Sequence, residues 1–123
     1  MAENYKADSK YEPGTVLIFG GDEEVTTTQL KDDTRVAGVV SEKPGYLMND
    51  GLKGDNVIAL ALQGRVPVKV VGIVKKGDLL VSASTRGFAI SNNRAGVGTV
   101  IGKAISSKDD AGAGTVEVVV GRV

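Results

Sequence analysis

The sequence predicts a compact all-β domain, either a barrel or a sandwich, built from a duplicated β-unit. Glycine makes up 17 of the 123 residues, about double the ~7% share that is usual in proteins, which suits many turns and bulges. Val, Ile, Leu and Ala dominate the apolar residues, and branched side chains favour packed sheets. No segment shows a helical period over ten residues, so we expect helix only as short turns.

The duplication rests on a glycine turn followed by an apolar strand, a pattern that occurs twice. Residues 13–18 read PGTVLI, and residues 76–81 read KGDLLV. Each copy reaches a second apolar run after a similar interval, VAGVV at 36–40 and VIGKA at 100–104. Repeated turn-and-strand units of this kind build small all-β scaffolds.

The predicted repeat covers residues 13–46 and 75–105. We expect its two copies to pack about an approximate two-fold axis, with their glycines in equivalent turns and strands. A glycine inside a strand marks a bulge or a close approach of another backbone. The expected equivalent pairs are Gly14 with Gly77 and Gly38 with Gly102.

Apolar runs and turn signals place the strands along the chain. The valines at 66, 68 and 70 alternate with polar residues and proline, which indicates a strand with one buried face. Pro67 within it predicts an edge strand or a bulge, because proline cannot donate to a sheet. The small, polar segment 106–114 is expected to be a surface loop. The expected strands are 15–19, 25–30, 35–41, 57–62, 65–70, 78–83, 88–91, 98–105 and 115–123.

The first residues differ from the rest of the chain. Residues 1–12 are polar, with Tyr5 and Tyr11 as their large side chains. We interpret them as an N-terminal extension or linker that leads from an upstream module. Residues 13–123 are then a single β domain, which we expect to be part of a longer protein.

Composition argues against several classes of function. The chain has 15 basic and 15 acidic residues and neither His nor Cys. A net charge of zero gives no field that steers the chain onto nucleic acid or an anionic membrane, so we expect neither partner. No apolar run approaches the ~18 residues that span a bilayer, so we expect no membrane insertion. Without His and Cys we expect no tightly bound transition metal and no cofactor.

Three acidic turns could offer oxygen ligands to calcium. They lie at 22–24, 32–33 and 109–110. None has the spaced Asp-x-Asp-x-Asp pattern of a dedicated calcium loop, so we interpret them as solvated turn residues and expect no metal site.

Hydroxyl groups are the next candidate reactive groups. Ser82, Ser84 and Thr85 lie close in sequence to Lys75 and Lys76. A serine without a histidine needs a lysine, an amino terminus or an intramolecular route to become nucleophilic, and lysines that flank a strand are usually solvated. We therefore expect a protein that is not an enzyme. Glycoside cleavage stays open as an alternative, because two converging carboxylates suffice for it.

Six segments together carry a family resemblance. In order they are AENY at 2–5, YEPGTV at 11–16, VAGVVS at 36–41, ALQGRVPVKV at 61–70, KGDLLV at 76–81 and VIGKA at 100–104. In this order they resemble the C-terminal domain of phage tail-fibre and related virion structural proteins, of the type found in phages of marine cyanobacteria. The resemblance covers nearly the whole chain. It implies a virion location, an upstream fibre shaft as partner and a homotrimer, since fibre shafts are usually trimeric.

The residues and the resemblance together predict a non-enzymatic structural module of a phage tail fibre or virion appendage. Such a module would cap or trimerise the fibre. The strand 57–62 is apolar on both faces, so we predict that Val57, Ala59 and Ala61 form the contact between subunits, although a buried central strand would show the same pattern.

Two alternative functions remain open. Loops at the fibre tip could serve in host attachment by binding a surface glycan or protein, and clustering of Tyr46, Asn49, Asn92 and Asn93 on one face would favour that role. The resembling family also includes, near this domain, a module that acts as an intramolecular chaperone and cleaves itself off. We identify no cleavage centre in this sequence.

Overall fold

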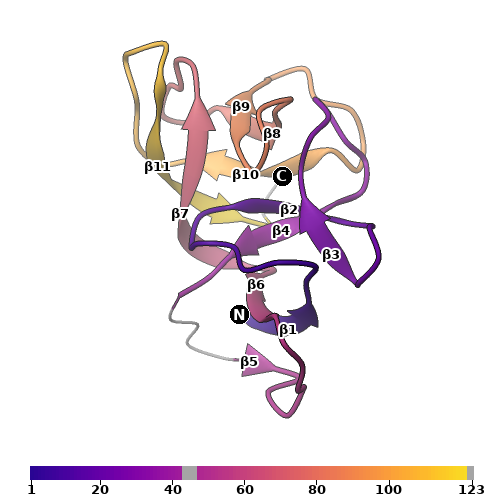
Figure 1. Ribbon diagram of the computed structural model, residues 1–123. Coiled ribbons are helices and arrows are strands. Elements are labelled where there is room, and N and C mark those ends of the chain that lie inside the picture. Colours follow the sequence, from indigo (N-terminus) through magenta and orange to yellow (C-terminus); the bar gives the residue numbers. More distant parts are fainter. Residues whose placement is uncertain (43–46, 122–123) are drawn as a thin grey trace.

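The computed structural model describes residues 1–42 and 47–121 of the chain. Every regular element in this part is a β-strand, as the sequence predicted, and none is a helix (Figure 1). The strands are β1 (Ala2–Lys6), β2 (Val16–Phe19), β3 (Val25–Thr27), β4 (Val36–Val40), β5 (Leu47–Met48), β6 (Val57–Ala61), β7 (Gly64–Val71), β8 (Leu79–Ser82), β9 (Ala89–Ser91), β10 (Val100–Ala104) and β11 (Ala113–Val120).

These strands form two sheets. The first has six strands in the order β3-β2-β4-β6-β1-β5, and the second closes into a barrel in the order β10-β11-β7-β9-β8. Figure 1 shows the barrel in the upper part of the view and the first sheet below it. The predicted all-β class is confirmed. The described residues hold no helix of the length and apolarity that crossing a membrane would require.

The two sheets repeat one arrangement of strands. In the first sheet β2 lies between β3 and β4, and in the second β8 lies between β9 and β10. The Gly14 N–H donates to the Val40 carbonyl at 2.9 Å, and the Gly77 N–H donates to the Ala104 carbonyl at 2.7 Å. Both glycines have positive φ, 88° and 95°. Gly14 and Gly77 therefore occupy equivalent turns, as predicted.

The two strand glycines are equivalent as well. The pairing of β2 with β4 shifts register beside Gly38, and that of β8 with β10 shifts beside Gly102. A Cβ at Gly38 would lie 2.5 Å from the Ala61 carbonyl oxygen, and one at Gly102 would lie 2.2 Å from that of Val119. Both glycines thus mark a bulge and a close backbone approach, as expected.

The repeat is longer than the sequence indicated. The bulged strands β4 and β10 pair with β6 and β11, which in turn pair with β1 and β7. A parallel bridge joins Ala7, just after β1, to Val25 in β3, and Val70 in β7 pairs in parallel with Ala89 in β9. Each repeat is therefore five strands that return on themselves. The first repeat comprises β1, β2, β3, β4 and β6, and the second comprises β7 to β11.

The first residues belong to the fold. Residues 2–6, interpreted above as part of an extension, form β1, which lies between β6 and β5. Ala2 is only 1% exposed, and the ring of Tyr5 packs edge-on against that of Phe19, with centroids 5.6 Å apart. The interpretation as a linker is wrong for these residues, because backbone pairing on both sides, rather than an apolar pattern, holds the strand.

Pro67 lies where a missing N–H is tolerated. It stands in β7 opposite Glu117 of β11. On its other side β7 pairs with β9 only at Val70, so Pro67 interrupts no ladder there. β7 is part of a closed barrel, and the prediction of an edge holds only for this section of the strand.

The apolar core extends across both repeats. One cluster lies within the first repeat and includes Leu17, Val25 and Leu60. The other fills the second repeat and takes in Val16 and Val39 from the first. The surface between the repeats is therefore part of the core.

Candidate functional site

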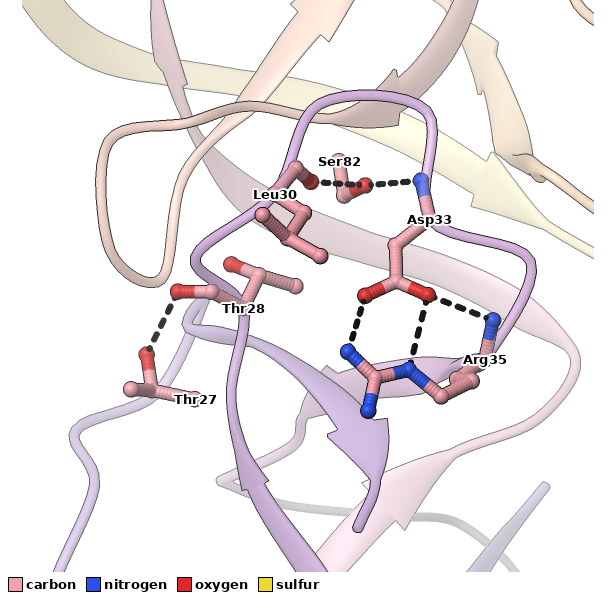
Figure 2. Close-up of polar contacts among 6 residues, drawn as sticks. All are labelled: Thr27, Thr28, Leu30, Asp33, Arg35 and Ser82. Atoms are coloured by element: carbon pink, nitrogen blue, oxygen red, sulfur yellow. Dashed lines mark hydrogen bonds and ion pairs between the residues drawn. The ribbon is translucent and has the colours of Figure 1, made fainter.

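A buried hydroxyl group joins the two repeats. Ser82, at the end of β8, is fully buried, and its Oγ faces the loop 28–35 of the first repeat (Figure 2). This Oγ accepts a hydrogen bond from the Asp33 N–H at 2.8 Å and donates one to the Leu30 carbonyl at 2.8 Å. The Asp32 N–H donates to the Ser82 carbonyl at 3.1 Å. A single serine thus satisfies much of the backbone of this loop.

An ion pair holds the same loop in shape. The Asp33 carboxylate accepts two hydrogen bonds from the Arg35 guanidinium, at 2.9 and 3.1 Å, and one from the Arg35 N–H at 2.9 Å (Figure 2). These bonds from Arg35 lower the pKa of Asp33, although burial acts in the opposite direction. The fork-like contact fixes the backbone whose N–H reaches Ser82.

The hairpin between β8 and β9 is seated on the first repeat. The Val16 N–H donates to the Gly87 carbonyl at 2.9 Å. The Gly87 N–H donates to the Thr28 Oγ1 at 2.9 Å and to the Thr28 carbonyl at 3.2 Å. A Cβ on Gly87 would lie 2.9 Å from the methyl group of Thr15, and its φ is +79°. The position therefore requires glycine for both space and conformation.

The hairpin of the second repeat contacts the loop of the first, but the hairpin of the first repeat does not contact the loop of the second in the same way. Phe19 is the equivalent of Ser82, because Phe19 pairs with Val25 as Ser82 pairs with Ala89. A two-fold axis would cover Phe19 with the second repeat, yet Phe19 is 45% exposed. The expected two-fold axis is therefore wrong. The repeats are joined head to tail, with the hairpin of the second on the loop of the first.

The candidate nucleophiles do not form a reactive centre. The hydrogen bonds of the Ser82 Oγ go to backbone groups of the neighbouring loop, and the residue has no exposed surface. Ser84 and Thr85 are exposed in the hairpin, while Lys75 and Lys76 are exposed before β8. Ser82 has a structural role at the junction.

The turn 109–110 is part of another local arrangement. Lys108 is 8% exposed, and its Nζ donates to the carbonyls of Gly72, Asp110 and Gly112. The same Nζ lies 2.9 Å from the Asp110 carboxylate, and its hydrogen bond lowers the pKa of that carboxyl group. Within residues 1–42 and 47–121, no three acidic side chains are placed to hold a metal ion.

Acidic residues from separate turns meet in one cleft of about 430 Å³. The charged residues that line it are Lys6, Asp8, Asp22, Glu23 and Asp55. Burial raises the pKa of Asp8, but hydrogen bonds from the hydroxyls of Tyr11 and Thr26, at 2.6 and 2.7 Å, outweigh burial and lower it. A glycosidase acid needs a raised pKa, so the shift of Asp8 argues against that role.

A second cleft, of about 840 Å³, lies between the repeats. Lys10, Lys69 and Arg86 line it together with Tyr11 and Glu12. Lys69 forms an ion pair with Glu12, so part of the positive charge is neutralised within the chain.

The predicted recognition residues do not form one cluster. Tyr46 lies outside the described residues. Asn49 follows β5, whereas Asn92 and Asn93 follow β9 in the second repeat. Figure 1 shows β5 at the bottom of the molecule and β9 near the top. The structure therefore separates Asn49 from the other two asparagines.

The predicted interface residues lie in a central strand. Val57, Ala59 and Ala61 belong to β6, which pairs with β4 on one side and β1 on the other. Ala61 is 2% exposed and packs in the cluster that both repeats share, so it is not available to a second chain. Val57 and Ala59 are half-buried. The doubly apolar pattern of this strand reflects its central position.

Sequence reasoning did not find the junction. Its partners are far apart in the chain, and Thr28, Asp33 and Gly87 carry no motif. One signal was present, because the end of the second strand of the repeat is Phe19 in one copy and Ser82 in the other. A polar residue in place of an aromatic one indicates that the two copies have different neighbours.

Comparison with known proteins gives matches at the level of structure. No protein-family model matches the chain, and neither does any curated protein. The structure is similar to that of the C-terminal fragment of bacteriophage phi29 gene product 12, with a TM-score of 0.69 and 13% identity over 97% of this chain and 98% of that one. It is also similar to the N base of head fiber gp8.5 of bacteriophage phi29, with a TM-score of 0.58 and 19% identity over 98% of this chain and 92% of that one.

The chain has the fold of two phage proteins. Both matches span nearly the full length of each partner, so they include both repeats rather than one barrel. The narrower resemblance to fibre proteins of cyanophages stays a prediction.

Proposed function

We propose that the chain is a non-enzymatic structural module of a phage fibre or another virion appendage. The observation that carries this proposal is the similarity, over both repeats, to the base of a phage head fiber. The similarity to the phage gene product 12 fragment supports it. Fold alone does not fix function, so the arrangement of the polar groups matters. The buried polar contacts of Ser82 and Thr28 join the repeats to each other.

The proposed role of the module is to cap or trimerise an upstream fibre shaft. Fibre shafts are usually trimeric, and a domain that caps one shares its three-fold axis. The proposed assembly is therefore a homotrimer located in the virion.

Host recognition and self-cleavage are the competing roles. Separation of Asn49 from Asn92 and Asn93 favours a structural role over a recognition tip. The burial of Ser82, whose hydroxyl group is bonded to backbone groups, gives no support to a cleavage centre.

Localisation tests the proposal. Purified particles of the phage that encodes the chain are probed with antibodies against it and analysed by mass spectrometry. We expect labelling at an appendage and a fixed number of copies per particle. Presence of the chain in infected cells but not in purified particles would overturn the proposal.

A further inference from the structure

We propose that a second copy of this chain docks onto the second repeat as the second repeat docks onto the first. Two surfaces take part. The hairpin surface is residues 19–24 of the first repeat, and the loop surface is residues 93–97 of the second, after Asn92, whose side chain donates to Asp32 of the first repeat at 3.0 Å. The proposal rests on the proposed trimer, in which three such contacts would join the chains head to tail.

The two surfaces are the free halves of the junction already described. The hairpin of the second repeat is seated on the loop that follows Thr28. The loop after Asn92 is its equivalent, because the Thr28 N–H donates to the Val16 carbonyl at 3.2 Å and the Asn92 N–H donates to the Leu79 carbonyl at 2.9 Å. When two repeats are joined head to tail, the hairpin of the first and the loop of the second have no partner repeat. A further copy of the chain can therefore bind there.

Exposed apolar side chains stand at the matching positions. Phe19 takes the place of Ser82, and Val97 takes the place of Asp33, which precedes the bulged strand by the same interval. Phe19 is 45% exposed and Val97 is 100% exposed. Within the chain the two residues at these positions, Asp33 and Ser82, are joined by a hydrogen bond from the Asp33 N–H to the Ser82 Oγ. Between chains the equivalent residues, Phe19 and Val97, would instead make an apolar contact.

The charges of the two surfaces are opposite. Asp22, Glu23 and Glu24 are exposed on the hairpin surface, and Arg94 is exposed on the loop surface. Opposite charges orient two partners as they meet and disfavour a wrong register.

Charge also distinguishes this contact from the one within the chain. There the hairpin carries Arg86, which donates to Gln29 at 3.3 Å, and the loop carries Asp32 and Asp33. The same loop carries Lys31 and Arg35, and Arg35 is paired with Asp33, so its charges balance. The acidic hairpin surface therefore meets a net positive charge on the loop surface of the second repeat, which carries Arg94, and not on the loop of the first.

The loop surface keeps its backbone paired in the free chain. The Leu79 N–H is the equivalent of the Val16 N–H that binds the Gly87 carbonyl. In this chain it donates to the Oδ1 of Asn93 at 2.8 Å. Asn93 is exposed, so a carbonyl of an incoming hairpin can take its place.

Introduced cysteines test the contact, because the chain has none of its own. The variants Phe19→Cys and Val97→Cys are prepared separately, mixed and oxidised. We expect a disulfide-linked dimer from the mixture and little from either variant alone. The control is Ile73→Cys, since Ile73 is 55% exposed and lies outside both surfaces. Equal dimer yields when Phe19→Cys is mixed with Val97→Cys or with Ile73→Cys would overturn the proposal.

A charge at the contact gives a second test. Val97→Asp places a carboxylate against the acidic hairpin surface, and its full exposure in the single chain leaves the fold intact. We expect the concentration at half-assembly in analytical ultracentrifugation to rise about tenfold or more, and Ile73→Asp to leave it unchanged. Unchanged assembly of Val97→Asp would disprove this contact while the trimer stands. A wild-type chain that stays monomeric would overturn both the trimer and the contact.

Discussion

Gly38 and Gly102 bring strands together so closely that no side chain fits between them. The carbonyl oxygen of the neighbouring strand occupies the space that a Cβ would need in both repeats. This constraint comes from the backbone, so it persists where the side chains of the two repeats differ. For that reason the glycines were the clearest sign of the repeat in the sequence.

Gly102→Ala is expected to lower the free energy of unfolding by roughly 2–4 kcal/mol, because the new methyl group would overlap the Val119 carbonyl. Gly51→Ala is the control, since a Cβ there has no neighbour within 4 Å and the position lies outside the proposed docking surfaces. We expect it to change the free energy by less than ~0.5 kcal/mol. Urea unfolding compares the two variants, and equal midpoints would contradict the prediction.

The ionised form of Asp33 is favoured by folding, since hydrogen bonds from Arg35 lower its pKa. A lowered pKa stabilises the fold above the ordinary carboxyl value of ~4, and this contribution is lost as pH falls through the folded-state pKa. We expect the wild type to exceed Asp33→Asn in free energy of unfolding by about 1 kcal/mol at neutral pH. The difference should shrink on acidification. A difference that urea unfolding finds constant down to about pH 2 would refute this linkage.

At the scale of elements, side-chain patterns predicted those strands that bury one apolar face. The predicted strands 15–19, 35–41 and 78–83 have nearly the same bounds as β2, β4 and β8. β1 was missed, because its sequence AENYK has no apolar alternation and its position depends on pairing with β6 and β5. A strand held through its backbone leaves no periodic signal.

The full length of the repeat could not be predicted for a similar reason. β6 is equivalent to β11 and β1 to β7 through their pairing, while their side chains differ. The junction was equally hidden, because Ser82 and Asp33 come together only when two loops from different repeats are in place. The sequence shows that Ser82 and Asp33 are present, but it does not show that they lie side by side in the fold.

Ser82→Ala is expected to weaken the junction. It would leave the Asp33 N–H and the Leu30 carbonyl without their buried partner, which costs about 1–3 kcal/mol. Ser84→Ala is the matched control, because Ser84 is exposed in the same hairpin. Thermal or urea unfolding measures both variants. If Ser82→Ala were as stable as Ser84→Ala, the junction would not depend on this hydroxyl group.

For the whole molecule, the head-to-tail joining of the repeats is the central structural property. The second repeat packs on the first through a continuous core and buried hydrogen bonds, yet each repeat leaves its other half of the contact free. Two repeats joined head to tail have two different ends, whereas the ends of a two-fold pair are equivalent. Two different ends suit the proposed role in an appendage that itself has a direction.

The acidic cleft gives a test of the proposed absence of enzyme activity. We expect no release of sugar from host-surface polysaccharide, because a general acid needs a raised pKa and hydrogen bonds from Tyr11 and Thr26 lower the pKa of Asp8 in this cleft. A reducing-sugar assay measures release. Release that is lost in Asp22→Asn or Glu23→Gln would show that the cleft is catalytic.

The molar mass of the chain in solution tests the proposed assembly most directly. Light scattering coupled to size exclusion reports this mass without any assumption about shape. A structural module that trimerises a fibre is expected to elute at three times the 12.7 kDa mass of one chain. A mass of 12.7 kDa that persists as the protein concentration is raised would contradict the account.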